Sequence, residues 1–170
     1  YPSVWAFWWP RFERITDWFI AFETGRRKSF RTLRTEAHGE IRIPSPAADF
    51  TLSGTADRID QAVSDGSLSI LDYKTGMLPS PTEVETGVSP QLALEAAMLA
   101  RRGFPGITVA PVSELAYIKL SGADPAGEFR NAGGSKSPPT ETLADEAYEG
   151  LVRLIAQFDR QATPYLSCPR

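Results

Sequence analysis

The chain has 170 residues, of which 42% are hydrophobic and 23% charged, as in an ordinary globular protein with one core. Its formal net charge of -3 excludes a protein that binds nucleic acid through overall positive charge. Cys168 is the only cysteine, which excludes an internal disulfide framework and any cysteine-built metal cluster made by this chain alone. No apolar run approaches the roughly 20 residues that span a bilayer, so we expect a soluble, cytoplasmic protein without a membrane partner.

The first predicted element is an amphipathic helix over Pro10–Arg27, where apolar residues recur at helical spacing and Pro10 suits the first turn. Three strands are predicted next. The cluster Ser64-Asp65-Gly66 is typical of a hairpin turn between the second and the third. The three strands cover Arg31–Ile43, Asp49–Val63 and Ser67–Thr75.

The second half of the chain predicts two more helices and one more strand. A helix is expected over Ser89–Gly103, with Ser89 as N-cap and Pro90 as the first helical residue. The alternating stretch Ser113–Ser121 predicts a strand, residues 122–139 a mobile loop, and Thr140–Gln161 a third amphipathic helix. The expected order is therefore helix, three strands, helix, strand, helix.

Three charged residues are expected on one face of the hairpin. A turn on Asp65-Gly66 would place Asp57 opposite Lys74, with Asp72 on the diagonal. A turn on Ser64-Asp65 would instead place Asp57 opposite Asp72. In either register the three charges share a face, because side chains of a strand alternate with a period of two.

Two carboxylates on one face repel each other unless a cation lies between them. Oxygen ligands suit a hard ion such as Mg²⁺ or Mn²⁺, and Lys74 would add a positive charge for hydrolytic phosphate chemistry. The structural alternative is a cross-strand ion network of Asp57, Asp72 and Lys74 that binds no ligand. The geometry by itself leaves both interpretations open.

Three spaced motifs resemble a known family. The stretches "GTADRID" (54–60), "LDYKTG" (71–76) and "PQLALEA" (90–96) resemble the nuclease motifs of the RecB-like branch of the PD-(D/E)XK superfamily. The wider context, "WWPRFERI" before them and "ELAYIKLSG" after them, is similar to the C-terminal nuclease domains of AddB subunits in bacterial AddAB-type helicase-nucleases. The resemblance implies an α/β fold with a mixed central sheet flanked by helices.

The resemblance also implies roles for individual residues. Asp57 and Asp72 would be metal ligands, Lys74 the catalytic lysine, and Gln91 a residue near the site that helps to hold the DNA strand. The expected cofactor is Mg²⁺, for which Mn²⁺ would substitute, and the expected partners are DNA and an AddA-type subunit. Glu95 stands where the family often has tyrosine, which leaves its role open.

The family's first motif lies on an upstream helix and carries a histidine or glutamate. Here His38 falls on the first predicted strand, where a partly exposed histidine without a ligand is expected. The flanks of Glu13 and Glu23 do not match the motif. We therefore interpret residues 1–170 as a single RecB-like nuclease domain from a longer helicase-nuclease subunit, without its first-motif helix. Some AddB relatives hold an iron-sulfur cluster on four cysteines, which Cys168 alone cannot build.

A basic run at the end of the first helix is a candidate for DNA contact. Arg26, Arg27 and Lys28 would bind backbone phosphates, and a solvated helix end is the alternative. The predicted function is a metal-dependent DNA exonuclease that hydrolyses phosphodiester bonds in double-strand break repair in the bacterial cytoplasm. The alternative function is a non-catalytic DNA-binding or subunit-docking module with an incomplete nuclease site.

Overall fold

The structure, a computed structural model, describes residues 2–166, with side chains from residue 5 onward. Within these residues five strands form one sheet in the order β1-β2-β3-β4-β5. Strands β3 and β4 are parallel and the other neighbours are antiparallel, so the sheet is mixed. The strands are β1 (Phe30–Ile43), β2 (Phe50–Ala62), β3 (Leu68–Lys74), β4 (Val112–Leu120) and β5 (Gly127–Asn131).

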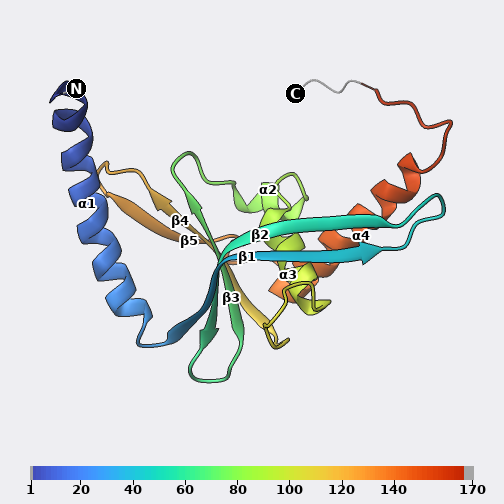
Figure 1. Cartoon of the computed structure of the whole chain (residues 1–170), viewed down its shortest axis with the longest axis horizontal. Helices are drawn as coiled ribbons and strands as arrows, with labels where there is room; N and C mark the ends of the chain where they lie inside the picture. Colours follow the sequence, from blue (N-terminus) through green and yellow to red (C-terminus); the bar gives the residue numbers. More distant parts are fainter. Residues whose placement is uncertain (1, 167–170) are drawn as a thin grey trace.

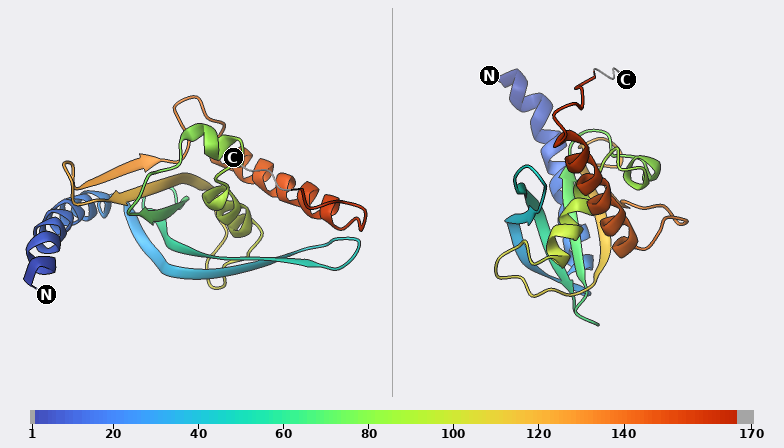
Figure 2. Two further views of the ribbon diagram at one scale, coloured as in Figure 1. Left: turned by 90° about the horizontal axis from the view of Figure 1, so that it is seen from above. Right: turned by 90° about the vertical axis from the view of Figure 1, so that its right-hand side faces the viewer.

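The helices lie on both faces of this sheet (Figures 1 and 2). They are α1 (Pro2–Arg26), α2 (Pro81–Glu85), α3 (Gln91–Ala100) and α4 (Thr140–Phe158). Helix α1 lies at one end of the molecule and packs against one face of the sheet. Helices α3 and α4 pack against the opposite face (Figure 1). The predicted α/β fold with a mixed sheet and flanking helices is confirmed.

Alternating side chains divide the core into two layers. Ile59 and Ile70 point toward α3 and join the larger cluster with Leu92 and Leu99, all almost fully buried. The next residue on β3, Leu71, points to the opposite face. There it joins Ala116 and Ile118, against which Trp18 and Phe22 of α1 pack. The period of two along β3 therefore assigns one set of side chains to α3 and the other to α1.

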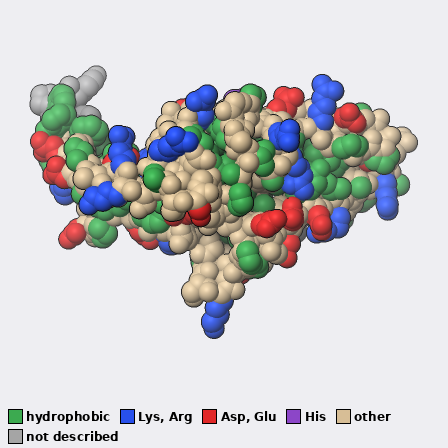
Figure 3. All heavy atoms as spheres, turned by 90° about the horizontal axis from the view of Figure 1, so that it is seen from below, with side chains coloured by type: hydrophobic (Ala, Val, Ile, Leu, Met, Phe, Trp, Pro, Cys, Tyr) green, Lys and Arg blue, Asp and Glu red, His purple; other side chains and the backbone are tan. Residues whose placement is uncertain are grey.

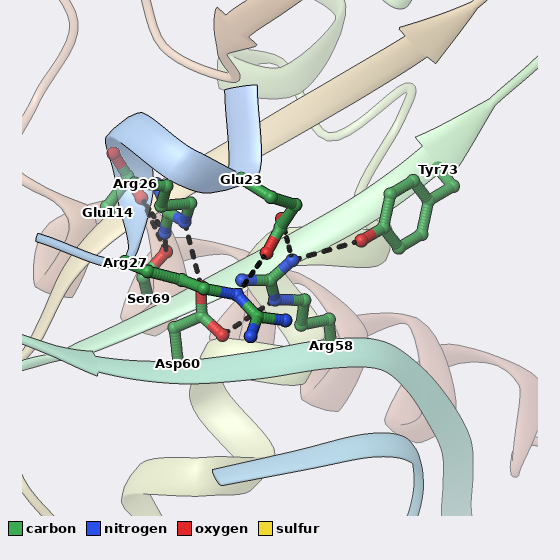
Figure 4. Close-up of polar contacts among 8 residues, drawn as sticks. All are labelled: Glu23, Arg26, Arg27, Arg58, Asp60, Ser69, Tyr73 and Glu114. Carbon is green, nitrogen blue, oxygen red and sulfur yellow. Dashed lines mark hydrogen bonds and ion pairs between the residues drawn. The ribbon is translucent and has the colours of Figure 1, made fainter. Parts of the chain in front are cut away.

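A buried ion network fastens the end of α1 to the sheet (Figure 4). Asp60 is fully buried, and its two carboxylate oxygens accept hydrogen bonds from Arg26 Nε at 2.8 Å and Arg58 Nε at 2.7 Å. Burial opposes the charge of Asp60, yet these two guanidinium groups outweigh it and lower the pKa of the carboxyl. Arg26 also donates to Glu114, and Arg58 to Glu23. The network therefore ties α1 to strands β2 and β4.

Close packing also brings α1 onto β5. A Cβ atom at Gly127 would lie 2.3 Å from the indole ring of Trp18, so only glycine permits this approach. At the far end of the sheet, the hairpin formed by β1 and β2 reaches the C-terminal end of α4 (Figure 2). There the Ala47 N–H donates to Asp159 at 3.3 Å.

The structure corrects several predicted boundaries. Helix α1 begins at Pro2, so Pro10 lies inside the helix and not in its first turn. Strand β5 lies within the stretch predicted as a loop, and α2 was not predicted. The N-cap of α3 is Pro90 and makes no side-chain hydrogen bond, so the prediction of Ser89 as cap was wrong.

The first half of α1 exposes large apolar side chains to solvent (Figure 3). They are Trp5, Phe7, Trp8, Trp9 and Phe12. Among the described residues, no helix combines the length and apolar character that crossing a membrane requires.

Candidate active site

The hairpin of β2 and β3 selects one of the two predicted registers. Ile59 pairs with Ile70 and Arg58 with Leu71, so paired residue numbers sum to 129. The loop is longer than a two-residue turn, because β2 ends at Ala62 and β3 begins at Leu68. The ladder stops at Arg58 and Leu71, and the next two residues in this register are Asp57 and Asp72.

The side chain of Asp57 accepts a backbone hydrogen bond at the point where the ladder between β2 and β3 ends. Its Oδ2 accepts a hydrogen bond of 2.8 Å from the backbone N–H of Tyr73. The side chain thus satisfies a donor that no backbone carbonyl of β2 reaches, and it remains half-buried at the opening between the two strands. The carboxylate is therefore held in place by β3 although it belongs to β2.

Asp72 is almost fully buried, with 2% of its surface exposed. Lys74, two residues further along β3, places its Nζ 2.9 Å from Oδ1 and 2.7 Å from Oδ2. Burial raises the pKa of Asp72, the Lys74 ammonium lowers it, the nearby charge of Asp57 raises it, and the net direction is upward. The prediction that these three charges share a face of the sheet is confirmed in this register.

Helix α3 brings Gln91 to the same place. The amide Nε2 of Gln91 donates to Asp72 Oδ1 at 2.7 Å, and its Oε1 accepts from Lys74 Nζ at 3.1 Å. Gln91 is the first residue of α3, and the helix packs over β3 through Leu92 and Ile70. The amide of Gln91 is thereby bonded to both charged groups of the strand.

Glu95 is a member of this site that the sequence left without a role. It lies one helical turn after Gln91, and its Oε1 accepts a hydrogen bond of 3.2 Å from Gln91 Nε2. The side chain is 5% exposed. Burial, followed by the charges of Asp72 and Asp57, raises the pKa of Glu95 to about 7. The four-residue spacing from Gln91 was the available signal, because it places both on one face of the helix.

The donor set of the site fits a hard divalent cation. Carboxylate oxygens are the ligands that Mg²⁺ and Mn²⁺ prefer, and Glu95 Oε2 is a buried carboxylate oxygen that accepts no hydrogen bond. Asp72 Oδ2 also accepts none, although it lies beside Lys74. Within residues 2–166, however, no three acidic, histidine or cysteine side chains converge closely enough to hold an ion together. Metal binding by Asp57 and Asp72 therefore stays a prediction.

Other candidate residues lie elsewhere. His38 is exposed on β1, opposite Thr55. Glu13 is exposed and accepts a hydrogen bond from Trp9. Glu23 belongs to the network with Arg58 under α1, on the sheet face that is turned away from α3.

Only part of the basic run at the end of α1 lies on the surface. Arg26 is buried and pairs with Asp60 and Glu114, which removes it from the surface offered to a phosphate. Arg27 and Lys28 are exposed, and Arg27 pairs with Glu23. Contact of Arg27 and Lys28 with DNA stays a prediction.

A comparison with known protein families covers nearly the whole chain, including the candidate site. Residues 5–170 match the PD-(D/E)XK nuclease superfamily. The chain belongs to this superfamily. Membership in the PD-(D/E)XK superfamily identifies the chain as a nuclease-type domain with the fold described above.

Several known proteins are similar to this PD-(D/E)XK chain. An uncharacterized protein of Rickettsia bellii is 30% identical over 164 residues, which are 89% of this chain and 19% of the relative. An uncharacterized protein of Rickettsia conorii is 43% identical over 86 residues, 51% of this chain and 10% of that protein. The crystal structure of SSO0001 is similar with a TM-score of 0.44 and 14% identity, covering 79% of this chain and 56% of that one. The chain thus spans about a fifth of the length of the Rickettsia bellii relative.

Proposed function

We propose that this chain is a Mg²⁺-dependent DNA exonuclease domain of an AddAB-type helicase-nuclease, which hydrolyses phosphodiester bonds in double-strand break repair. The observation that carries the proposal is the convergence of Asp57, Asp72, Lys74 and Gln91 where β2 and β3 separate. Acidic oxygens can hold a metal ion that assists phosphate hydrolysis, and an ammonium group beside them can stabilise negative charge on the phosphate. Mn²⁺ would replace Mg²⁺, because both accept oxygen ligands.

The proposed roles follow from the position of each side chain. Asp57 and Asp72 would hold the ion, which when bound supplies Lewis-acid stabilisation of charge on the scissile phosphate. Lys74 is partly exposed, so its ammonium reaches both Asp72 and solvent. It would orient the attacking water and stabilise the negative charge that develops on the phosphate.

Gln91 would act through its hydrogen bonds. Its amide donates to Asp72 and accepts from Lys74, so it would hold the carboxylate and the ammonium in fixed positions. The exposed position of Gln91 at the start of α3 also suits contact with the DNA strand. Arg27 and Lys28, exposed after the last turns of α1, would add backbone phosphate contacts.

The AddB assignment rests on the flanking stretches "WWPRFERI" and "ELAYIKLSG" and on the greater length of the relatives. In such a protein this domain would act in the bacterial cytoplasm together with an AddA-type subunit that supplies the motor.

The test is cleavage of end-labelled linear DNA by the 170-residue chain with Mg²⁺, Mn²⁺ or EDTA. Wild type and the surface control Glu149→Gln should shorten the DNA only when metal is present. Asp72→Asn and Lys74→Met should not. Metal-independent cleavage, or equal activity in Asp72→Asn, would contradict the proposal.

A second candidate is a docking or DNA-binding module without catalysis. It is favoured by the direct ion pair between Lys74 and Asp72, which already compensates the charge of that carboxylate. It is also favoured by the lack, within residues 2–166, of three converging metal ligands. A module would bind DNA equally well in Asp72→Asn and wild type, and neither protein would cleave it. Metal-dependent cleavage by the wild type would exclude this candidate.

A further inference from the structure

Glu95 is the only acidic residue of α3, and it faces the sheet rather than solvent. A carboxylate that is 5% exposed is costly to bury unless other groups compensate its charge or its hydrogen-bonding capacity. The apolar residues around it on α3, such as Leu92 and Leu99, belong to the core and would have allowed an apolar side chain at this position.

The hydrogen bonds of Glu95 account for one of its two oxygens. Oε1 accepts from Gln91 Nε2 at 3.2 Å, whereas Oε2 accepts no hydrogen bond from any described residue. Buried polar atoms in folded proteins nearly always have a partner. The free oxygen therefore indicates a partner other than the described residues, such as a water molecule or a bound ligand.

The charges around Glu95 indicate what that partner is. The negative charges of Asp72 and Asp57 both act on Glu95, and Lys74 is the opposing positive charge that acts on it. Three carboxylates thus face one ammonium group. A divalent cation at Asp57 and Asp72 would compensate this excess of negative charge.

We propose that Glu95 is a positioning residue for the divalent cation, whose free Oε2 accepts a hydrogen bond from the hydration shell of an ion held by Asp57 and Asp72. An indirect contact agrees with the structure, because no three acidic side chains of the described residues converge closely enough to bind one ion directly. It also suits Mg²⁺, which keeps several of its waters when bound to proteins. At this position the chain has a carboxyl group, which can carry a negative charge, where the resemblance to RecB-like nucleases leads one to expect a tyrosine.

This inference rests on the proposed function, because it assumes that Asp57 and Asp72 bind the ion. The experiment is calorimetric titration of the metal-free 170-residue chain with Mn²⁺ at pH 8. Four proteins are compared: wild type, Glu95→Gln, Asp72→Asn and the surface control Glu149→Gln. Glu95→Gln is the informative variant, since its amide oxygen can still accept from Gln91 while its charge is lost.

We expect Glu95→Gln to bind Mn²⁺ about 10 to 100 times more weakly than wild type, as for other residues that act behind the direct ligands. Asp72→Asn should bind none, and Glu149→Gln should match wild type. A melting curve without metal shows whether Glu95→Gln is folded. If it is not, Glu95→Met, which needs no polar partner, takes its place with the same expected loss.

The outcomes separate the two proposals. Unchanged Mn²⁺ affinity in a folded Glu95 variant, with binding lost in Asp72→Asn, would overturn the role of Glu95 and leave the metal-dependent function standing. Absence of Mn²⁺ binding in the wild type would overturn both. An equal loss of affinity in Glu149→Gln would also overturn the role of Glu95, because the effect would then be one of overall charge.

Discussion

Asp57 on β2 accepts a hydrogen bond of 2.8 Å from the backbone N–H of Tyr73 on β3, immediately beyond the last paired residues of the two strands. The carboxylate thus closes the hairpin ladder at the point where the strands separate. Asp57 consequently has a structural task as well as its proposed task as a metal ligand, and the two can be separated by substitution.

Asp57→Asn should keep the fold and lose metal-dependent cleavage. The amide oxygen of asparagine can still accept from the Tyr73 N–H, whereas it is a much poorer ligand for Mg²⁺ than a carboxylate. Asp57→Ala should in addition lower the free energy of unfolding by about 1 to 3 kcal/mol, because the Tyr73 donor then has no partner. Urea unfolding and cleavage assays on both variants measure the two effects. A large stability loss in Asp57→Asn would argue against this division of roles.

Lys74→Met should reduce cleavage by about 100-fold or more, as expected for loss of a positioned group that aids proton transfer or charge stabilisation. It should also raise the pKa of Asp72 further, because Lys74 is the neighbour whose hydrogen bond and charge lower it. Carbon-13 NMR titration of the aspartate carboxyls in the metal-free chain measures that shift. An unchanged titration of Asp72 would mean that the ion pair does not form in solution.

Glu95 should make the metal-free protein less stable as the pH rises. Folding raises the pKa of Glu95 from 4.5 to about 7, so the folded state holds the proton more tightly than the unfolded state. The contribution of protonated Glu95 to the free energy of unfolding is therefore fully present below pH 4.5 and is lost as the pH rises to about 7. The shift corresponds to at most about 3 kcal/mol.

Urea unfolding of wild type and Glu95→Gln in EDTA, between pH 4.5 and 8, measures this dependence. The raised pKa of Asp72 also lowers the free energy of unfolding as the pH rises. Both proteins share this part of the pH dependence. Glu95→Gln should lack the part of the slope that belongs to Glu95. Identical pH profiles would show that Glu95 does not titrate in this range.

Asp60→Asn should destabilise the fold without weakening Mn²⁺ binding. It leaves the buried guanidinium groups of Arg26 and Arg58 without their shared carboxylate, and removal of one partner from a buried ion pair costs about 3 to 5 kcal/mol. The network lies on the α1 side of the sheet, whereas the candidate metal ligands face α3. Urea unfolding and Mn²⁺ titration, with Glu149→Gln as the control, test both statements. A loss below about 1 kcal/mol would show that the network contributes little.

The amino-acid sequence predicted the common face of the charged residues because both possible turns give a register in which the two-residue period of a strand places them on one side. Ile59 and Ile70 have the parity of Asp57 and Asp72, so burying the two isoleucines on one side determines the side of the carboxylates. The choice between the two registers needed the hairpin itself. The loop from residue 63 to residue 67, which contains Gly66 at φ 75°, set it.

The sequence by itself determined strands β1 to β4, the shared face of Asp57, Asp72 and Lys74, and the helical spacing of Gln91 and Glu95, since these follow from local periodicity and a turn signal. It did not determine the short strand β5. Only the tertiary structure decided that α3 lies over β3, so that Glu95 comes near Asp72, and that Arg26 turns inward onto Asp60. Those contacts join residues between 23 and 34 positions apart, and side-chain packing, which no local pattern encodes, brings them together.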